Sequence, residues 1–352
     1  MVDKMSPIKK LLLQSFSLII TPMLSLSYVE LNQHPQESGG NRLSYNVFPI
    51  IMYDSDIGFG FGGKGIVKNL CQKNESFDLI LFASTKGEQW YVFTFSIPDF
   101  EIRQGKKYDL AFDVIFEFDK YLKSNFFGFG NNSKDNEWQF PLEFARIEAN
   151  LGHAFTRTII YEIKTSYNHT SVYGYKMANP LMSPQIPGEG EKQTFYLSSD
   201  LRWDTRDSQI HPKGGFNFAF RTDFALKWFG ADYRYSRYRL EINQYHQLFS
   251  PSHILAARIW GQHIDGVAPY YEQSIIGGSD TARGYKAHRF IDNDMLLASL
   301  EYRFKIYKNI GSVLFIDGGR VSSNLTKEIL TDWKTNWGWG LRYYLTVLLK
   351  IS

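Results

Sequence analysis

Residue types that often carry chemistry are common in this chain, but few have the spacing that a reaction needs. Segment 58–63 reads Gly-Phe-Gly-Phe-Gly-Gly and formally matches G-x-G-x-x-G. A dinucleotide site also needs a helix N-terminus after the glycines to hold the pyrophosphate. Residues 64–69 show no helical period. We therefore expect these glycines to lie in a strand, where they allow sharp curvature or the close approach of another segment.

Other catalytic signatures are equally weak. The eight histidines include neither H-E-x-x-H nor a His/Cys cluster at metal-ligand spacing, so the sequence predicts no metal site and no cofactor. No G-x-S-x-G elbow is present, and a serine hydrolase would have to assemble its residues from different strands. Asp204, Arg206 and Asp207 lie in a compact charged turn, a kind of segment that is usually solvated surface. We expect a protein that is not an enzyme.

Any site in this chain must be positioned by strands. From Tyr45 onward the dominant hydrophobic period is two, and the clearest run is 108–118, with an apolar face and an acidic face. The runs are about 10 to 14 residues long, which exceeds the usual ~5–6 of globular strands and matches strands that cross a bilayer at a tilt. Longer polar segments are expected at 119–140 and 173–191. Fourteen candidate strands begin near Tyr45, Gly58, Phe77, Trp90, Lys107, Leu142, Thr158, Thr194, Gly215, Tyr233, Ile254, Met295, Gly311 and Trp337.

Composition separates the remaining fold classes. The chain has 352 residues, of which 16% are aromatic and 21% charged, and this excludes disordered and collagen-like proteins. Beyond residue 27 no apolar run approaches the roughly 18 residues of a membrane-spanning helix. A large soluble β protein and an outer-membrane barrel both fit, but strand length and aromatic content favour the barrel. The predicted fold class is all-β, a transmembrane antiparallel β-barrel.

The chain is expected to contain one folded domain after an export signal. Residues 1–27 contain three lysines, an apolar stretch and a small-x-small triplet, the order of a secretory signal peptide. Residues 28–44 are then a short periplasmic segment, and 45–352 form the barrel. Removal of the signal lowers the formal net charge from +3 to +1, and nothing in the composition suggests a nucleic-acid partner. The single Cys71 cannot form an internal disulfide.

The most informative segment is 277–285, Gly-Gly-Ser-Asp-Thr-Ala-Arg-Gly-Tyr, which lies in a predicted long loop over about 262–294. Together with other motifs in the same order, it resembles the bacterial surface antigen superfamily, the BamA and TamA-type outer-membrane assembly and translocation barrels. The resemblance extends from Tyr45 to the C-terminus. The other motifs are the strand opener 48–53 with Gly58 and Gly60, the loop 127–131, the turn 204–207 with Gly214 and Gly215, and segments 315–319 and 338–342.

This resemblance implies a 16-stranded barrel in the outer membrane of a Gram-negative bacterium. It also implies an extracellular loop that folds into the lumen, where its arginine meets acidic residues on the next two strands. Strand parity in this sequence permits that arrangement, because the acidic residues on both strands should point inward. A surface loop with a solvated arginine is the alternative. The expected loop lock consists of Arg283, Gly284, Tyr285, Glu301 and Asp317.

Two departures from the family pattern affect the expected function. About 14 strands are visible, so either the sequence stops before the last two strands or the barrel closes with fewer. The short segment 28–44 leaves no room for the periplasmic repeat domains that gather client polypeptides. We expect a role in outer-membrane protein insertion or translocation, with membrane lipid and a client polypeptide as partners. A lipid hydrolase is the least favoured alternative. A passive or structural pore is the main alternative, supported by the expected lumen charges of Asp113, Glu117, Arg221, Arg237, Arg239 and Glu241.

Overall fold

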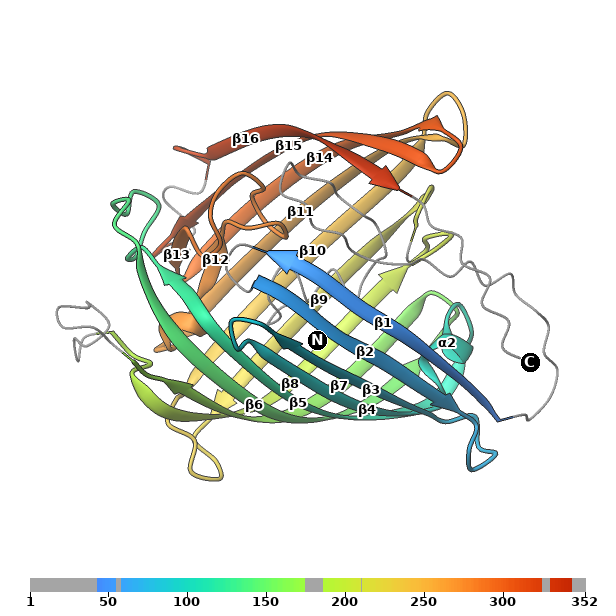
Figure 1. Ribbon diagram of the computed structural model, residues 1–352, viewed down its shortest axis with the longest axis horizontal. Helices are drawn as coiled ribbons and strands as arrows, with labels where there is room; N and C mark the ends of the chain where they lie inside the picture. Colours follow the sequence, from blue (N-terminus) through green and yellow to red (C-terminus); the bar gives the residue numbers. More distant parts are fainter. Residues whose placement is uncertain (1–42, 55–57, 175–185, 210, 325–329, 344–352) are drawn as a thin grey trace.

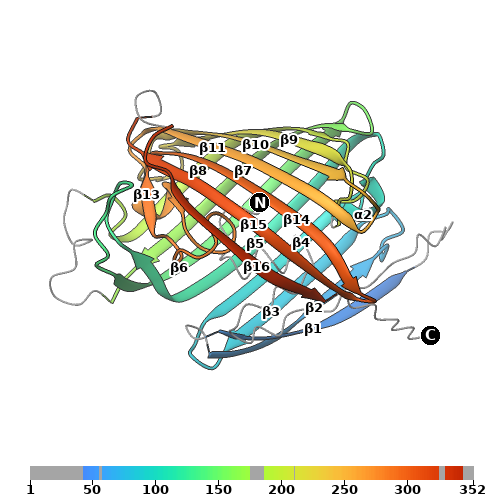
Figure 2. The same ribbon diagram turned by 90° about the horizontal axis from the view of Figure 1, so that it is seen from above.

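A computed structural model describes residues 43–54, 58–174, 186–209, 211–324 and 330–343. The expected signal peptide at 1–27, nearly all of the segment 28–44, and the C-terminal residues 344–352 lie outside the described residues. The described chain forms one long, strongly curved antiparallel sheet that wraps around a central space (Figures 1 and 2). None of its helices is long and apolar enough to cross a membrane.

The sheet has 14 strands in chain order, which confirms the predicted fold class and the predicted number of strands. Each strand begins within a few residues of its expected start, because alternation of apolar and polar side chains marks a strand wherever one face is buried. The strands are β1 Ser44–Asp54, β2 Gly58–Lys68, β3 Ser76–Ser84, β4 Gln89–Ile97, β5 Tyr108–Phe126, β6 Trp138–Ala154, β7 Ile159–Val172, β8 Gly190–Asp204, β9 Gly215–Leu226, β10 Tyr235–Gln247, β11 His253–Gly266, β14 Asp294–Tyr307, β15 Ile310–Ser322 and β16 Lys334–Tyr343.

The predicted loop at 119–140 was too long. Strand β5 has 19 residues and β6 has 17, and they stay paired as far as Phe126 and Trp138. Lys120, one of the polar residues that suggested a loop, lies on the outward face and forms an ion pair of 2.7 Å with Glu143 of β6. Toward the end of the two strands the buried face is aromatic, with Phe126 and Phe140 in one buried cluster. Both strands therefore continue well beyond the residues that the sequence assigned to them.

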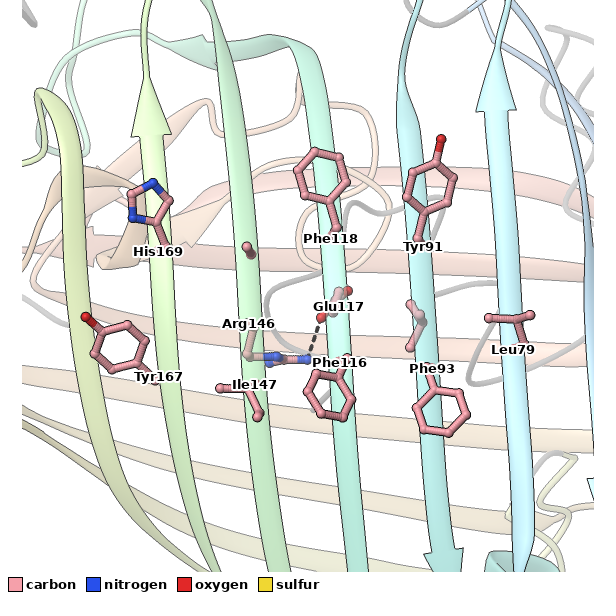
Figure 3. A pocket seen from close by; sticks show the side chains of 12 residues that line it. Leu79, Tyr91, Phe93, Phe116, Glu117, Phe118, Arg146, Ile147, Tyr167 and His169 are labelled. Carbon is pink, nitrogen blue, oxygen red and sulfur yellow. Dashed lines mark hydrogen bonds and ion pairs between the residues drawn. The ribbon is translucent and has the colours of Figure 1, made fainter. Parts of the chain in front are cut away.

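The two faces of the sheet differ in chemistry, as the alternation predicts. Figure 3 shows Phe93, Phe116 and Tyr167 on the outward face, around a hollow of about 430 Å³, while Glu117 and Arg146 pair on the other face. The inner face is itself divided. On β1 to β5 it carries an apolar cluster, and from β5 to β11 most of the buried charged side chains lie beside smaller apolar clusters. The apolar cluster consists of Ile50, Met52, Ile80, Phe82, Trp90, Val92 and Ile115.

The glycines of β2 allow the apolar cluster to pack directly on the backbone. A Cβ atom on Gly60 would lie 2.2 Å from Cζ of Phe82 and 3.1 Å from Cγ of Met52. Any larger residue would displace the Phe82 ring, so the G-x-G-x-x-G pattern serves close packing. The segment after it continues as strand rather than starting a helix, in agreement with the expectation against a nucleotide site.

The sheet order begins at β1 and finishes at β16, and over the described residues these two strands do not pair with each other. Figures 1 and 2 show β1 in blue and β16 in red as the two edges of the curved sheet. The short helix α2, Phe100–Arg103, lies in the connection from β4 to β5. Its Arg103 donates to both carboxylate oxygens of Asp113, at 2.7 and 2.8 Å, and this fixes the connection to the inner wall.

Candidate functional site

The connection from β11 to β14, residues 267–293, is the candidate site. It contains the 3-10 helix η3, Tyr270–Glu272, and a small hairpin of β12, Ser274–Ile276, and β13, Phe290–Asp292. The sequence indicated a featureless loop from 262, but β11 continues to Gly266, and the hairpin was not expected. The hairpin lies inside the curve of the sheet, beside β14 and β15 (Figure 1). The loop therefore packs on the inner wall.

Apolar burial seats this loop (hereafter the β11–β14 loop) on the wall. Ile276 and Ala282 of the loop are fully buried against Leu297 of β14 and Val321 of β15. Gly319 of β15 makes room, because a Cβ there would lie 2.9 Å from Cδ1 of Ile276. Burial of this kind contributes roughly 25 cal/mol for each Å² of apolar surface. The polar contacts below are thus made by a segment that packing already holds in place.

Arg283 contacts both carboxylates that the sequence assigned to it. Its Nε and Nη2 donate to Oδ2 and Oδ1 of Asp317 at 2.8 and 2.6 Å, and its backbone N donates to Oδ2 at 3.1 Å. Nη1 donates to Glu301. The guanidinium also lies 3.7 Å from the ring centre of Phe315, a cation–π contact. Asp317 is fully buried, so the pair is shielded from solvent.

The charge of Arg283 is balanced within this cluster. Burial by itself lowers the pKa of the Arg283 guanidinium, but the hydrogen bond to Asp317 and the negative charge of Glu301 outweigh burial and raise this pKa. Glu301 accepts in addition from Arg303 at 2.8 Å and lies 3.4 Å from Arg342 of β16. The cluster therefore joins the loop to β14, β15 and β16.

Gly284 and Tyr285 bring the loop against the edge strand. Gly284 has φ +99°, a conformation in which only glycine is unstrained, and a Cβ there would lie 3.4 Å from the side chain of Asn336 on β16. The Tyr285 hydroxyl donates to the backbone oxygen of Thr335 at 3.4 Å, and its ring packs edge-on against Phe290. All five residues of the expected loop lock thus lie in one contiguous group. Their role is taken up below as a proposal.

A second contact of the loop was missed by the sequence analysis. Glu272 of η3 lies next to Arg237 of β10, with Nη1 of Arg237 2.9 Å from Oε2 and 3.3 Å from the backbone oxygen of Glu272. Both side chains are buried. No motif marks Glu272, and Arg237 was expected only as one of several lumen charges. The signal that could have found them is the run of inward-facing arginines Arg237 and Arg239 on one strand, which calls for acidic partners.

The β11–β14 loop also contacts the loop between β5 and β6. Arg289 donates to Oγ and the backbone oxygen of Ser133 at 2.8 and 3.0 Å, and the N–H of Gly130 donates to the backbone oxygen of Ile291 at 2.8 Å. Asn131 donates to the backbone oxygen of Asp332, 2.7 Å away in the β15–β16 connection. Three connections at the same end of the barrel therefore interlock across its opening.

The expected charged turn is separate from this site. Arg206 donates to both carboxylate oxygens of Asp204, at 2.9 and 2.7 Å, and Asp207 accepts from the backbone N–H of Lys213 at 2.9 Å. These bonds close the connection between β8 and β9 on itself. It lies at the opposite end of the strands from the β11–β14 loop, because β8 and β11 run in opposite directions. The turn gives no indication of a ligand.

The inner wall between these regions is lined by ion pairs. Over the part of the chain that the structure describes, no group of three His, Cys, Asp or Glu side chains is placed to hold a metal ion. The lumen charges expected from the sequence instead have partners of opposite charge. The pairs are Asp113 with Arg103, Glu117 with Arg146, Arg221, Arg237 and Arg239 with Asp223, and Glu241 with Arg258.

A curved antiparallel sheet with an apolar outer face, a charged inner face and a loop held on the inner wall defines a membrane β-barrel of the outer-membrane type. The comparisons with known proteins give the particular family. Residues 69–349 match the model of the Omp85 superfamily domain, and the chain belongs to that superfamily. It is a protein of the Gram-negative outer membrane, and it is a barrel rather than an enzyme.

Individual relatives agree with this assignment. The chain is 25% identical over 288 residues to the outer membrane protein assembly factor BamA of Nitratidesulfovibrio vulgaris, and the match includes 76% of this protein and 33% of the relative. Its structure is similar to that of BamA from Haemophilus ducreyi lacking POTRA domains 1–3, with TM-score 0.63, 16% identity, and coverage of 86% and 64% of the two proteins.

CdiB from Escherichia coli gives TM-score 0.59, 12% identity, and coverage of 86% of this protein and 56% of that one. At these identities the likeness to solved structures concerns the fold alone. The chain spans about a third of the length of its curated relative. Membership of the Omp85 superfamily, with a BamA among its relatives, thus confirms the resemblance first noted in the motifs.

Proposed function

We propose that this barrel acts in the insertion or translocation of client polypeptides at the outer membrane. Support comes from its family and from a relative described as an outer membrane protein assembly factor. The proposed partners are an extended client polypeptide and the surrounding membrane lipid. The chemistry is non-covalent, because the described site consists of hydrogen-bond donors, acceptors and apolar surface rather than a nucleophile with a base.

The β11–β14 loop acts in this proposal as a plug of the lumen, with Arg283 as its lock. The observation that carries this role is the fully buried carboxylate of Asp317, which accepts three hydrogen bonds from Arg283. A buried carboxylate is costly without such partners, so withdrawal of the loop requires either water or a substitute cation at Asp317. The lock therefore adds to the free energy that withdrawal of the loop requires.

The organisation of the chain is proposed on the sequence pattern: residues 1–27 as an export signal, 28–44 as a short periplasmic segment, and 45–352 as the barrel region. The N-terminal sequence of the protein recovered from purified outer membranes tests the first boundary. A mature protein that still begins at residue 1 would contradict the signal. Cleavage near residue 27 would agree with it.

Depletion of the protein in its native cell tests the function. Loss of integral outer-membrane proteins or of a secreted client is the expected result. Liposome insertion of a client barrel and single-channel conductance, measured on one purified sample, separate this role from a passive pore. A sample that conducts ions but inserts no client, from cells whose outer-membrane proteins are unaltered by depletion, would leave the pore as the function.

The proposed lock is tested by Arg283→Ala, with Arg234→Ala as the matched control, because Arg234 is exposed in the β9–β10 connection. We expect the first variant to reach the membrane with a β11–β14 loop that proteinase K cleaves faster, and the second to match the wild type. Equal cleavage of the loop in wild type and Arg283→Ala would contradict the lock without affecting the assignment to the family.

A further inference from the structure

The inner wall of β8 to β10 carries an unusual concentration of arginine around one carboxylate. Asp223 of β9 accepts from Nε of Arg221 at 2.8 Å, from Nε of Arg237 at 2.9 Å and from Nη2 of Arg239 at 2.7 Å. The hydroxyl of Ser198 donates to Oδ1 of the same carboxylate at 2.6 Å. Three guanidinium groups thus converge on a single buried carboxylate of the wall.

Arg237 offers two edges of its guanidinium to two different partners. The Nε and Nη2 edge faces Asp223 of the wall, while Nη1 faces the side-chain and backbone oxygens of Glu272 in the loop. Arg237 also lies over the ring of Tyr196, 5.6 Å from its centre. The loop therefore supplies the second carboxylate that Arg237 contacts.

We propose that Arg237, with Arg221 and Arg239 around Asp223, forms a carboxylate-binding site of the lumen wall, and that Glu272 is its internal occupant. When the β11–β14 loop withdraws, the site accepts a carboxylate of a polypeptide in the lumen, from either an acidic residue or the C-terminal end. This inference rests on the proposed function, since it supplies the polypeptide. It names a substrate contact that the lock at Arg283 does not provide.

The form of the occupied site favours a peptide carboxylate. Glu272 uses its carboxylate and its own backbone oxygen on the same Nη1, so the site recognises an acidic residue together with its main chain. The neighbouring wall is aromatic and apolar, with Tyr196, Tyr235 and Ile264 in one buried cluster that also holds Ala268 of the loop. A polypeptide segment with one acidic residue and apolar neighbours matches this surface.

Binding of fluorescent peptides to the full-length barrel in detergent tests the site. Three peptides of equal length serve as probes: one with a central glutamate and an amidated end, one with a free C-terminal carboxylate only, and one neutral. Glu272→Gln removes the internal carboxylate while keeping its size. Asp265→Asn is the matched control, because Asp265 is an exposed carboxylate at the end of β11, just before the same loop.

We expect Glu272→Gln to bind an acidic peptide about tenfold more tightly than wild type, the gain that follows if Glu272 occupies the site in nine of ten molecules. A double variant of Glu272→Gln with Arg237→Gln should lose this gain in affinity, whereas a double variant with Arg234→Gln should keep it. The neutral peptide should show no gain. Which of the two acidic probes responds identifies the source of the carboxylate.

Unchanged acidic-peptide affinity in Glu272→Gln, or an equal gain for the neutral peptide, would overturn the site. Gel mobility of unheated samples shows whether each variant is folded. Client insertion is measured separately on the same samples. A barrel that inserts clients without gaining peptide affinity contradicts this inference alone, and a barrel that binds acidic peptides but inserts no client contradicts the proposed function alone.

Discussion

Two arginine–carboxylate contacts hold the β11–β14 loop, and the loop supplies the arginine in one and the carboxylate in the other. At one end the loop supplies the cation, because Arg283 reaches Asp317 and Glu301 of the wall. At the other end the wall supplies the cation, because Arg237 reaches Glu272 of the loop. The loop thus extends along the inner wall from β10 to β15. It contributes a carboxylate to the contact at β10 and an arginine to the contact at β14 and β15.

The two contacts differ in the partners that the wall residue keeps when the loop withdraws. The Arg283 end leaves the fully buried Asp317 without its three hydrogen bonds. The Arg237 end leaves Arg237 still paired with Asp223, and only one edge of its guanidinium loses a partner. We infer that loss of the first contact costs more free energy than loss of the second, which is exchangeable.

The largest expected effect is that of Asp317→Ala. It leaves the Arg283 charge largely buried with Glu301 as its remaining partner, and removal of one member of a buried pair typically costs about 3 kcal/mol or more. The urea midpoint of unfolding from lipid bilayers measures the loss, with Asp265→Ala as control. A midpoint within error of the wild type would show that the Arg283 end is no more essential than the Glu272 end.

Arg283→Lys keeps the charge but removes the fork that spans two carboxylates and the stacking on Phe315. We expect the loop to be weakened by roughly 2 kcal/mol, because a charged hydrogen bond is worth about 1.5–3 kcal/mol and the remaining ammonium still pairs with one carboxylate. The rate of proteinase K cleavage within 277–289 measures this opening. If the lysine variant is cleaved as slowly as the wild type, the lock requires only a positive charge at residue 283 and not the guanidinium geometry.

Glu272→Ala should have a smaller effect, about 1 kcal/mol, because Arg237 keeps its bonds to Asp223. Hydrogen exchange of the amides in 267–276 should increase, while exchange around Arg283 stays unchanged. The double variant with Arg283→Ala tests independence of the two ends, and additive effects are expected for sites without shared partners. Coupling well above roughly 0.5 kcal/mol would show that the loop moves as one rigid unit.

Gly284→Ala is expected to have the smallest effect, roughly 1 kcal/mol or less. The cost comes from placing a side chain at positive φ, since the contact with Asn336 at 3.4 Å is only slightly tight. The change should appear as a small decrease of the urea midpoint, with Gly105→Ala as a matched positive-φ glycine in open space. A larger decrease of the urea midpoint for Gly284→Ala than for Gly105→Ala would show that the contact between the loop and β16 is tighter than the 3.4 Å distance indicates.

Much of the fold could be predicted because strand alternation is a local property. The starts of 14 strands followed from period two alone, and the same parity put Glu301 and Asp317 on the inner face. The errors arose where local polarity and tertiary packing disagree. Residues such as Lys120 and Lys123 read as loop, but they lie on β5, whose inward face packs Phe126 against aromatic side chains.

Contacts between distant segments could not be predicted in this way. Glu272 and Arg237 are 35 residues apart, and Arg289 and Ser133 are 156 residues apart. Nothing in the local pattern links them, because their proximity depends on the curvature of the whole sheet and on how the loop folds inward. Parity says that Arg237 faces the lumen, but it does not say what meets it there.

The sequence by itself determined the fold class, the approximate start of each strand and the inward face of Glu301 and Asp317. The fold class, the strand starts and the inward face of Glu301 and Asp317 follow from the hydrophobic period, whereas the pairing of Arg283 with these two residues was expected only from the family resemblance. The tertiary structure alone decided that the loop has a second, oppositely charged contact, that three connections interlock, and that glycines in β2 hold an apolar cluster. The physical reason is that curvature brings side chains from distant strands into one buried space, where each charge must have a partner.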